Sequence, residues 1–114
     1  MEVDSAALAD GLLKVNLDGR LDIDGARAVE DRFAFMTTTQ RSNVIVDLSA
    51  VSFLASIGIR MLMTAARGQH GRGGKLVLAA AEPAVRKVLV TAGIDQLIPM
   101  YDDLVSAQNA FAGS

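Results

Sequence analysis

Two short segments near the start of the chain have the polar and apolar pattern of strands. In residues 12–18, hydrophobic side chains alternate with polar ones, which is the period of a strand with one buried face. Residues 2–8 form a second such segment, and Asp10-Gly11 between the two is typical of a hairpin turn. The pattern therefore predicts a β-hairpin at the start of the chain.

Three later segments indicate further strands. Residues 43–48 and 76–79 are apolar almost without interruption, which suits strands that are buried on both faces. Residues 94–100 lead into a short final strand. Between the first of these strands and the next helix, we expect residues 49–55 to form a connector.

Four segments repeat their apolar residues at helical spacing. The first begins near Asp24, which we expect to be its N-cap, and ends in the β-branched run Thr37-Thr38-Thr39. The second is expected to end among the glycines from Gly68 to Gly74. The second, third and fourth helices are predicted to start near Ser56, Glu82-Pro83 and Asp102-Asp103.

The predicted elements follow the order β-β-α-β-α-β-α-β-α. Strands that alternate with helices in this way favour a mostly parallel sheet covered by helices. We therefore predict an α/β fold, with a mixed, mainly parallel sheet of four to five strands and about four helices. With 114 residues and no linker or repeat, residues 1–114 are expected to form one domain.

Composition and charge exclude several classes of function. The net charge is −2 and no short block holds more than two basic residues, so we expect no direct binding of nucleic acid. The chain has no cysteine and one histidine, so we predict no catalytic residues, no metal site and no cofactor. No apolar run is long enough to span a membrane, and no signal peptide is recognised. These features predict a cytoplasmic protein.

Ser56 is the residue most suggestive of function. A buried strand, a short loop and a helix that opens on this serine follow one another from Val46 to Ile59. The N–H groups at a helix start lack partners, so a phosphate on Ser56 would lie in a favourable field there. Gly58 would leave the approach to the serine uncrowded. The residues alone nevertheless favour the simpler interpretation, in which Ser56 is the N-cap of the helix.

The segment from Asp47 to Gly58 resembles the signature of STAS domains, the family of anti-sigma factor antagonists. The family pattern is roughly Asp-Leu-Ser-x-Val-x-Phe-Leu-Asp-Ser-x-Gly. The upstream segment from Leu17 to Asp22 is similar to the family's Gly-x-Leu-Asp turn, and segments 75–78, 85–89 and 92–94 are similar to its second half. The resemblance covers nearly the whole chain and implies the STAS fold.

The resemblance also implies a function without enzymatic activity. A STAS antagonist binds an anti-sigma factor that is also a serine kinase of the histidine-kinase-like ATPase type. The kinase phosphorylates the antagonist and the complex separates, until a serine phosphatase removes the phosphate. By resemblance Ser56 is the phosphoacceptor, and the partner-binding residues are Leu21, Asp22, Asp24, Ala55, Ile57, Gly58 and Arg60.

Two positions depart from the family pattern. The family usually has Asp immediately before the acceptor serine, whereas this chain has Ala55. The absence of this Asp would slow phosphorylation of Ser56 or make the protein a constitutive binder of its partner. Ile57 replaces the common small hydroxyl residue and so removes a second acceptor. The Ala55 departure is the main support for an alternative, a STAS interaction subunit of a signalling or lipid-transport assembly that is never phosphorylated.

Other candidate sites are weaker. The segment from Gly71 to Lys75 is superficially similar to a phosphate loop, but Gln69 and Leu76 stand where that motif needs Gly and Ser or Thr. We interpret it as a helix stop and turn, and His70 as a solvated residue. The neighbouring carboxylates of Asp22 and Asp24 could suggest a metal site, but we interpret them as residues at the start of a helix. A small enzyme that binds a nucleotide or phosphate ester at Ser56 is the third and weakest hypothesis.

Overall fold

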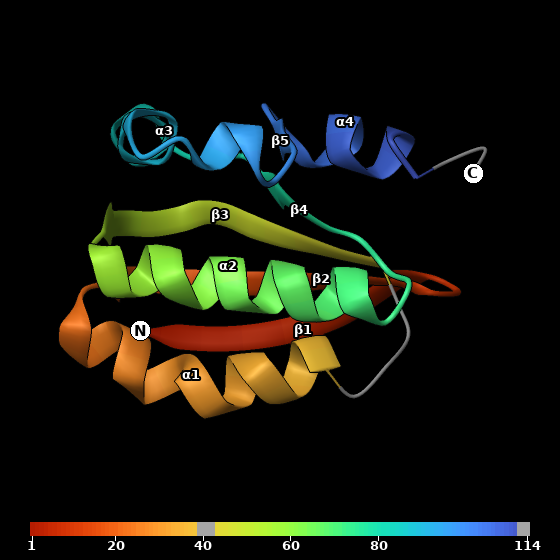
Figure 1. The fold of residues 1–114 in the computed structure, drawn as a ribbon, viewed down its shortest axis with the longest axis horizontal. Coiled ribbons are helices and arrows are strands. Elements are labelled where there is room, and N and C mark those ends of the chain that lie inside the picture. Colours follow the sequence, from red (N-terminus) through yellow and green to blue (C-terminus); the bar gives the residue numbers. More distant parts are fainter. Residues whose placement is uncertain (39–42, 112–114) are drawn as a thin grey trace.

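Five strands form one mixed sheet in the computed structural model, which describes residues 1–38 and 43–111 (Figure 1). The strand order is β1-β2-β3-β4-β5; β1 pairs antiparallel with β2, and the other pairs are parallel. The strands are β1 (Glu2–Ala9), β2 (Leu12–Leu21), β3 (Asn43–Leu54), β4 (Leu76–Ala79) and β5 (Met100–Tyr101). The predicted α/β fold with a mainly parallel sheet is confirmed.

Helices separate the parallel strands, as the sequence predicts. They are α1 (Ile23–Thr38), α2 (Ser56–Gly71), α3 (Pro83–Thr91), the short 3₁₀ helix η1 (Ile94–Gln96) and α4 (Leu104–Asn109). The Thr run does end α1, although Thr39 lies outside the described residues. Within the described part of the chain, no helix is long and apolar enough to cross a membrane.

The two faces of the sheet carry separate apolar clusters. Side chains along β3 alternate between them: Val44 and Val46 belong to the larger cluster and Ile45 to the smaller. Helices α1, α2 and α3 cover the larger cluster, and α4 covers the smaller one. Because β3 is buried on both faces, its sequence is apolar without alternation over residues 44–46.

Strands β2 and β3 are longer than the sequence predicts. The expected connector over residues 49–55 is wrong, since β3 continues to Leu54, and β2 continues past residue 18 to Leu21. The two extensions pair with each other, with Leu21 opposite Leu54. Register shifts on both sides of Asp18 interrupt the alternation that marks a strand, so the sequence pattern ends early although the hydrogen bonding does not.

Gly19 occupies a backbone conformation that favours glycine. Its φ is +119°, and a Cβ atom placed on it would lie 3.2 Å from the Cα atom of Met1. The first residue of the chain therefore packs against the main chain of β2 near the end of that strand.

Arg72 connects the C-terminal ends of α1 and α2. Its Nη2 atom donates to the main-chain oxygen of Thr37 at 2.8 Å and to Oε1 of Gln69 at 2.6 Å. The side chains of Thr37 and Gln69 are buried beside it. One guanidinium group thus satisfies oxygen atoms on both helices.

Candidate functional site

Ser56 is the first residue of α2 and its side chain is exposed. It follows directly on β3, whose tip lies at the same end of the molecule as the starts of α1 and α2 (Figure 1). Among the described residues, no hydrogen bond or ion pair joins its hydroxyl to Asp22, Asp24 or Arg60. Because Ser56 is exposed, its hydroxyl is accessible to a partner protein.

The N-cap of α2 is Ala55, so the interpretation of Ser56 as the N-cap is wrong. Ala55 has the extended backbone of a cap residue (φ −99°, ψ 170°), and its carbonyl oxygen accepts from the N–H of Gly58 at 3.0 Å. A methyl side chain accepts no hydrogen bond, and the helix has no side-chain cap. Ser56 lies one position inside the helix, where its hydroxyl is not committed to capping.

One main-chain hydrogen bond fixes the start of α2 against the end of β2. The N–H of Ala55 donates to the carbonyl oxygen of Leu21 at 2.9 Å. Asp22 follows Leu21 and Ser56 follows Ala55, so segments more than 30 residues apart meet at one edge of the sheet. Parallel pairing of β2 with β3 produces this meeting, because the carboxyl ends of parallel strands share an edge.

Gly58 has a packing role that differs from the predicted one. It is buried, and a Cβ atom on it would stand 2.8 Å from Cδ1 of Leu54 and 3.0 Å from the Cβ atom of Leu21. The glycine lets α2 approach the ends of β2 and β3; it does not clear space around the serine. Leu21 is buried as well. Leu21 and Gly58 were both predicted to bind the partner, but both are buried and pack beneath the exposed residues.

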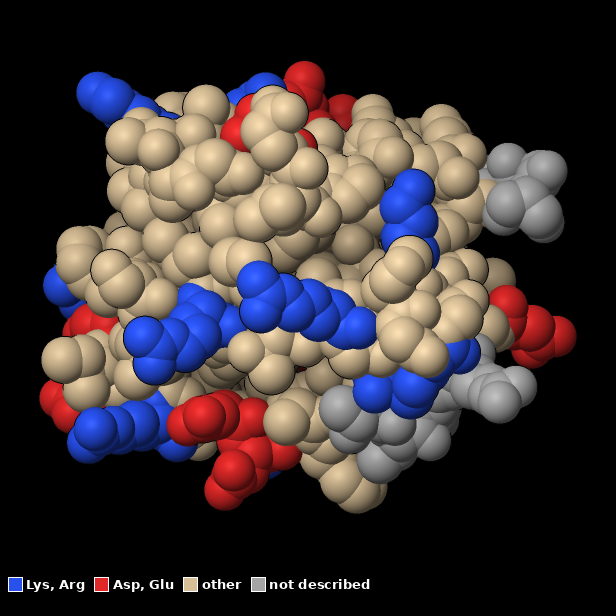
Figure 2. Space-filling view, in the orientation of Figure 1, with Lys and Arg blue, Asp and Glu red and all other residues tan. Residues whose placement is uncertain are grey.

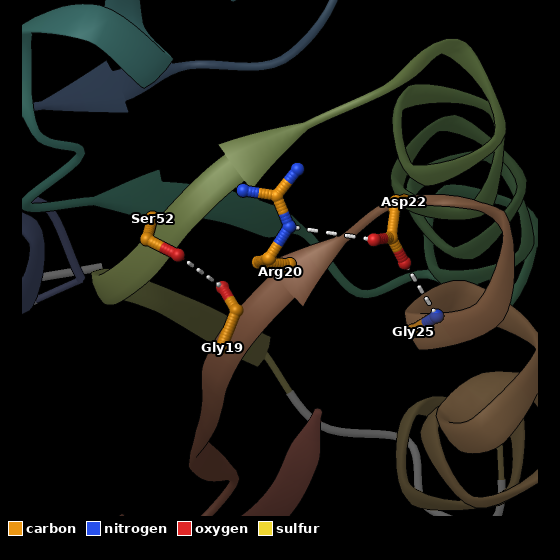
Figure 3. Close-up of polar contacts among 5 residues, drawn as sticks. All are labelled: Gly19, Arg20, Asp22, Gly25 and Ser52. Carbon is orange, nitrogen blue, oxygen red and sulfur yellow. Dashed lines mark hydrogen bonds and ion pairs between the residues drawn. The ribbon is translucent and has the colours of Figure 1, made fainter.

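Asp22 caps α1, which corrects the prediction that Asp24 is the cap. The N–H of Gly25 donates to Oδ1 of Asp22 at 2.8 Å, and Nε of Arg20 lies 3.4 Å from Oδ2 (Figure 3). The hydrogen bond from Gly25 is the main cause that lowers the pKa of Asp22, and Arg20 acts in the same direction. The Asp22 side chain is thus a half-exposed carboxylate with a fixed orientation.

Arg20 and Phe53 are surface residues that sequence analysis missed. They pair across β2 and β3, and the guanidinium carbon of Arg20 lies 4.4 Å from the centre of the Phe53 ring. Phe53 is 40% exposed although it is aromatic. Next to this pair, the hydroxyl of Ser52 donates to the carbonyl oxygen of Gly19 at 3.4 Å (Figure 3).

The exposed and half-exposed residues at the ends of β2 and β3 and at the start of α2 form a surface at this edge of the sheet. We call it the Ser56 surface, and its residues are Arg20, Asp22, Phe53, Ala55 and Ser56.

The other predicted partner-binding residues lie beside the Ser56 surface or on α1. Ile57 is half-buried and Arg60 is exposed; both line a groove of about 220 Å³ between α1 and α2. Asp24 is exposed in the first turn of α1.

The remaining candidate segments lie away from the Ser56 surface. The segment from Gly71 to Lys75 ends α2 and turns into β4, and His70 is exposed. Over residues 1–38 and 43–111, no group of three or more His, Asp or Glu side chains is arranged to hold a metal ion.

Comparisons with known proteins match the chain to one family. The family model described as "Mlab, STAS domain" matches residues 5–100. The anti-sigma-F factor antagonist RsfB of Mycobacterium tuberculosis is 25% identical over 104 residues, which cover 91% of this chain and 84% of RsfB. A crystal structure of an anti-sigma factor antagonist from Mycobacterium paratuberculosis is 27% identical, with a TM-score of 0.81 over 96% of this chain and 93% of that one.

A more distant structure shares the fold. The anti-sigma factor antagonist SpoIIAA in its unphosphorylated form is 18% identical and has a TM-score of 0.80, with 99% of this chain and 98% of that chain covered. A structure of SpoIIAA from Bacillus in its phosphorylated form also matches, with a TM-score of 0.71 over 96% of this chain and 99% of that one. Since the family model spans most of the sequence and the fold agrees, the chain belongs to the STAS domain family.

Proposed function

We propose that this STAS domain is an anti-sigma factor antagonist, a cytoplasmic binding module without enzymatic activity of its own. Its partner is an anti-sigma factor that is also a serine kinase of the histidine-kinase-like ATPase type. The antagonist binds this kinase through the Ser56 surface and thereby releases a sigma factor. The observation that carries the proposal is the exposed Ser56 hydroxyl at the start of α2, held beside Asp22 by the bond between Ala55 N–H and the Leu21 carbonyl.

Phosphorylation of Ser56 is the proposed switch. The kinase transfers the terminal phosphoryl group of ATP to the Ser56 hydroxyl: the bond from phosphorus to the ADP oxygen breaks, a bond to the serine oxygen forms, and the hydroxyl proton is released with ADP. The product carries a charge of about −1.5 to −2 where the partner met a neutral hydroxyl. That charge would repel the ADP phosphates bound to the kinase, which favours separation of the complex. A serine phosphatase then restores the binding form.

Two lines of support come from relatives. RsfB and the Mycobacterium paratuberculosis protein are named as anti-sigma factor antagonists, at 25% and 27% identity over most of both chains. SpoIIAA has been described in phosphorylated and unphosphorylated forms. We extend the antagonist function and the phosphorylation to this chain because Ser56 has the exposure that a kinase substrate requires.

Ala55 supports the alternative function, an interaction subunit of a signalling or lipid-transport assembly that is never phosphorylated. A carboxylate just before the serine would orient either the hydroxyl or the kinase. Here the methyl group of Ala55 offers no such contact. In this alternative the Ser56 surface binds its partner permanently and ATP has no effect.

A binding titration separates the two functions. Purified anti-sigma kinases from the source organism are titrated with the protein in ADP and in ATP, and phosphate is mapped by mass spectrometry. For the proposed switch we expect a complex in ADP, its loss in ATP, and phosphate on Ser56. Ser56→Ala should keep the complex in both nucleotides, and Ser56→Asp should weaken it.

Ser49→Ala is the matched control, because Ser49 is an exposed serine on β3, the strand that leads to Ser56. It should behave like the unmodified protein. A complex that persists in ATP without phosphate on Ser56 would establish the alternative. If none of the kinases binds, and Ser56→Asp does not alter the binding of any partner, the proposed function is wrong.

A further inference from the structure

A large hollow lies at the opposite end of α2 from Ser56. Its volume is about 750 Å³, and it lies between the C-terminal half of α2, the start of β4 and the segment 97–99 before β5. Arg67 on its wall follows Ser56 by 11 residues, or about 16 Å of helix. The hollow is therefore separate from the Ser56 surface.

The floor of the hollow is apolar and comes from three elements. Met63 lies on α2, Leu76 opens β4, and Ile98 follows η1. Leu76 and Ile98 are buried, whereas Leu97 on the wall is 63% exposed. Sites that receive apolar ligands are lined mainly by apolar side chains, as this hollow is.

The rim of the hollow is basic. Arg67 and Lys75 are exposed on its wall, and the imidazole of His70 lies between them in sequence. No acidic side chain lines the hollow, and residues 48–81 contain no Asp or Glu at all. Figure 2 shows basic side chains in a band across the face that α2 occupies. The charge complementary to this rim is negative.

The C-terminus of α2 does not cancel this positive field. The last carbonyl groups of a helix together carry about half a negative charge, whereas Arg67 and Lys75 carry one full positive charge each, and these carbonyl groups also have donors. The Gln69 oxygen accepts from the N–H groups of Arg72 and Gly74 at 3.1 and 2.9 Å, and the His70 oxygen accepts from Gly73 at 3.0 Å. The charged side chains on the rim therefore determine which ligand the hollow attracts.

We propose that this hollow binds a single-chain amphiphile with an anionic headgroup. The apolar chain lies over Met63, Leu76 and Ile98, and a carboxylate or phosphate headgroup pairs with Arg67 and Lys75. The volume falls within the roughly 300–1,000 Å³ typical of small-molecule sites. This site is independent of the proposed antagonist function, because it shares no residue with the Ser56 surface.

The test is a titration by calorimetry with dodecanoate and monododecyl phosphate, both below their micelle concentrations. Dodecyl glucoside is the neutral control with the same chain, and inorganic phosphate is the control without a chain. Amide chemical shifts locate the site. We expect saturable binding of both anionic amphiphiles, weaker binding of both controls, and shifts confined to residues 63–76 and 97–99.

Variants assign the contacts. Arg67→Glu and Lys75→Glu should each weaken binding about tenfold, since each removes a charge-assisted hydrogen bond. Leu97→Ser should weaken the binding of the amphiphile's alkyl chain. Because Leu97 is exposed, this change should leave the fold intact. Arg27→Glu is the matched control, because Arg27 is an exposed arginine on α1 that does not line the hollow. It should bind as tightly as the unmodified protein.

Three results would overturn the proposal. The first is no saturable binding of either anionic amphiphile. The second is binding that Arg27→Glu weakens as much as Arg67→Glu does. The third is binding to vesicles of anionic phospholipid, with the same dependence on Arg67, but not to the soluble amphiphiles. That last result would make the basic face a membrane-contact surface and not a site for a single chain.

Discussion

Gly58 of α2 and Leu21 of β2 are in such close contact that a methyl group on Gly58 would lie 3.0 Å from the Leu21 Cβ atom. The same methyl group would lie 3.2 Å from the carbonyl oxygen of Leu21. That oxygen accepts the hydrogen bond from Ala55 that fixes the start of the helix. The position of Ser56 therefore depends on the absence of a side chain two residues later.

We expect Gly58→Ala to lower the free energy of unfolding by about 1–3 kcal/mol, because the added methyl group overpacks a buried contact. Urea denaturation measures the change. Gly71→Ala is the control in the same helix, since nothing lies within 4 Å of the added Cβ atom there. A similar loss of stability in both variants would show that close approach at Leu21 is not the cause.

Ala55→Asp should stabilise the protein and favour phosphorylation. Ala55 has the backbone of an N-cap but no capping side chain, so a carboxylate at this position can accept from the unpaired N–H groups of α2. We expect a gain of about 0.5–2 kcal/mol in the free energy of unfolding. If the proposed kinase acts on Ser56, its initial rate should also rise.

The control for this change is Ala55→Val, which adds bulk without an acceptor. It should not stabilise the protein, because the side chain has no oxygen to cap the helix. Equal stability of Ala55→Asp and the unmodified protein would contradict the assignment of Ala55 as an N-cap. An unchanged phosphorylation rate, with increased stability, would separate the capping role from any role in catalysis by the kinase.

The capping of α1 by Asp22 should make stability depend on pH. The hydrogen bond from Gly25, aided by Arg20, lowers the pKa of Asp22 in the folded state. A carboxyl group of this kind stabilises the fold above its unfolded pKa, near 4, and the contribution fades as pH falls through the folded pKa. The stability difference between the unmodified protein and Asp22→Ala should therefore be constant near neutral pH and shrink in acid.

Asp103→Ala is the matched control for this prediction. Ser106 donates its N–H to Asp103 at 2.7 Å and lowers the pKa of Asp103, at the start of α4. The stability difference between the unmodified protein and Asp103→Ala should also shrink in acid. Asp103→Ala should have no effect on binding at the Ser56 surface. A difference for Asp22→Ala that is independent of pH between about 3 and 7 would contradict the capping interaction.

Arg72→Met should destabilise the protein through the connection between α1 and α2. The substitution keeps an apolar chain but removes the donor to the Thr37 carbonyl and to Oε1 of Gln69. Unsatisfied oxygens at a buried site cost about 1–3 kcal/mol. Arg67→Met, which removes an exposed arginine from α2, should change thermal stability much less. Equal effects of the two changes would contradict the connecting role.

Hydrophobic periodicity was sufficient to predict the order of elements. Residues 43–48 and 76–79 are apolar because both faces of their strands are covered, and the start of α2 at Ser56 follows from the apolar stripe behind it. The late ends of β2 and β3 were not predictable in this way. Their last residues are strands only because they pair with each other, through two register shifts.

The surroundings of Ser56 were predictable in part. The position of the serine follows from local sequence, but the pairing of Arg20 with Phe53 depends on a register between strands that are 33 residues apart. The buried position of Leu21 and Gly58 likewise arises from the packing of α2 on the sheet. Local signals favoured Asp24 and Ser56 as caps, whereas the helices begin one residue after Asp22 and Ala55.

The contact of Met1 with Gly19 has a practical consequence for experiments. Gly19 precedes Leu21 by two residues, or about 7 Å of strand. A purification tag or fluorescent fusion joined to Met1 would start beside the Ser56 surface and compete with the binding partner for that space. Helix α4 lies toward the other end of the strands (Figure 1). Tethering to a sensor chip or a reporter is therefore better done after α4, where the Ser56 surface stays free.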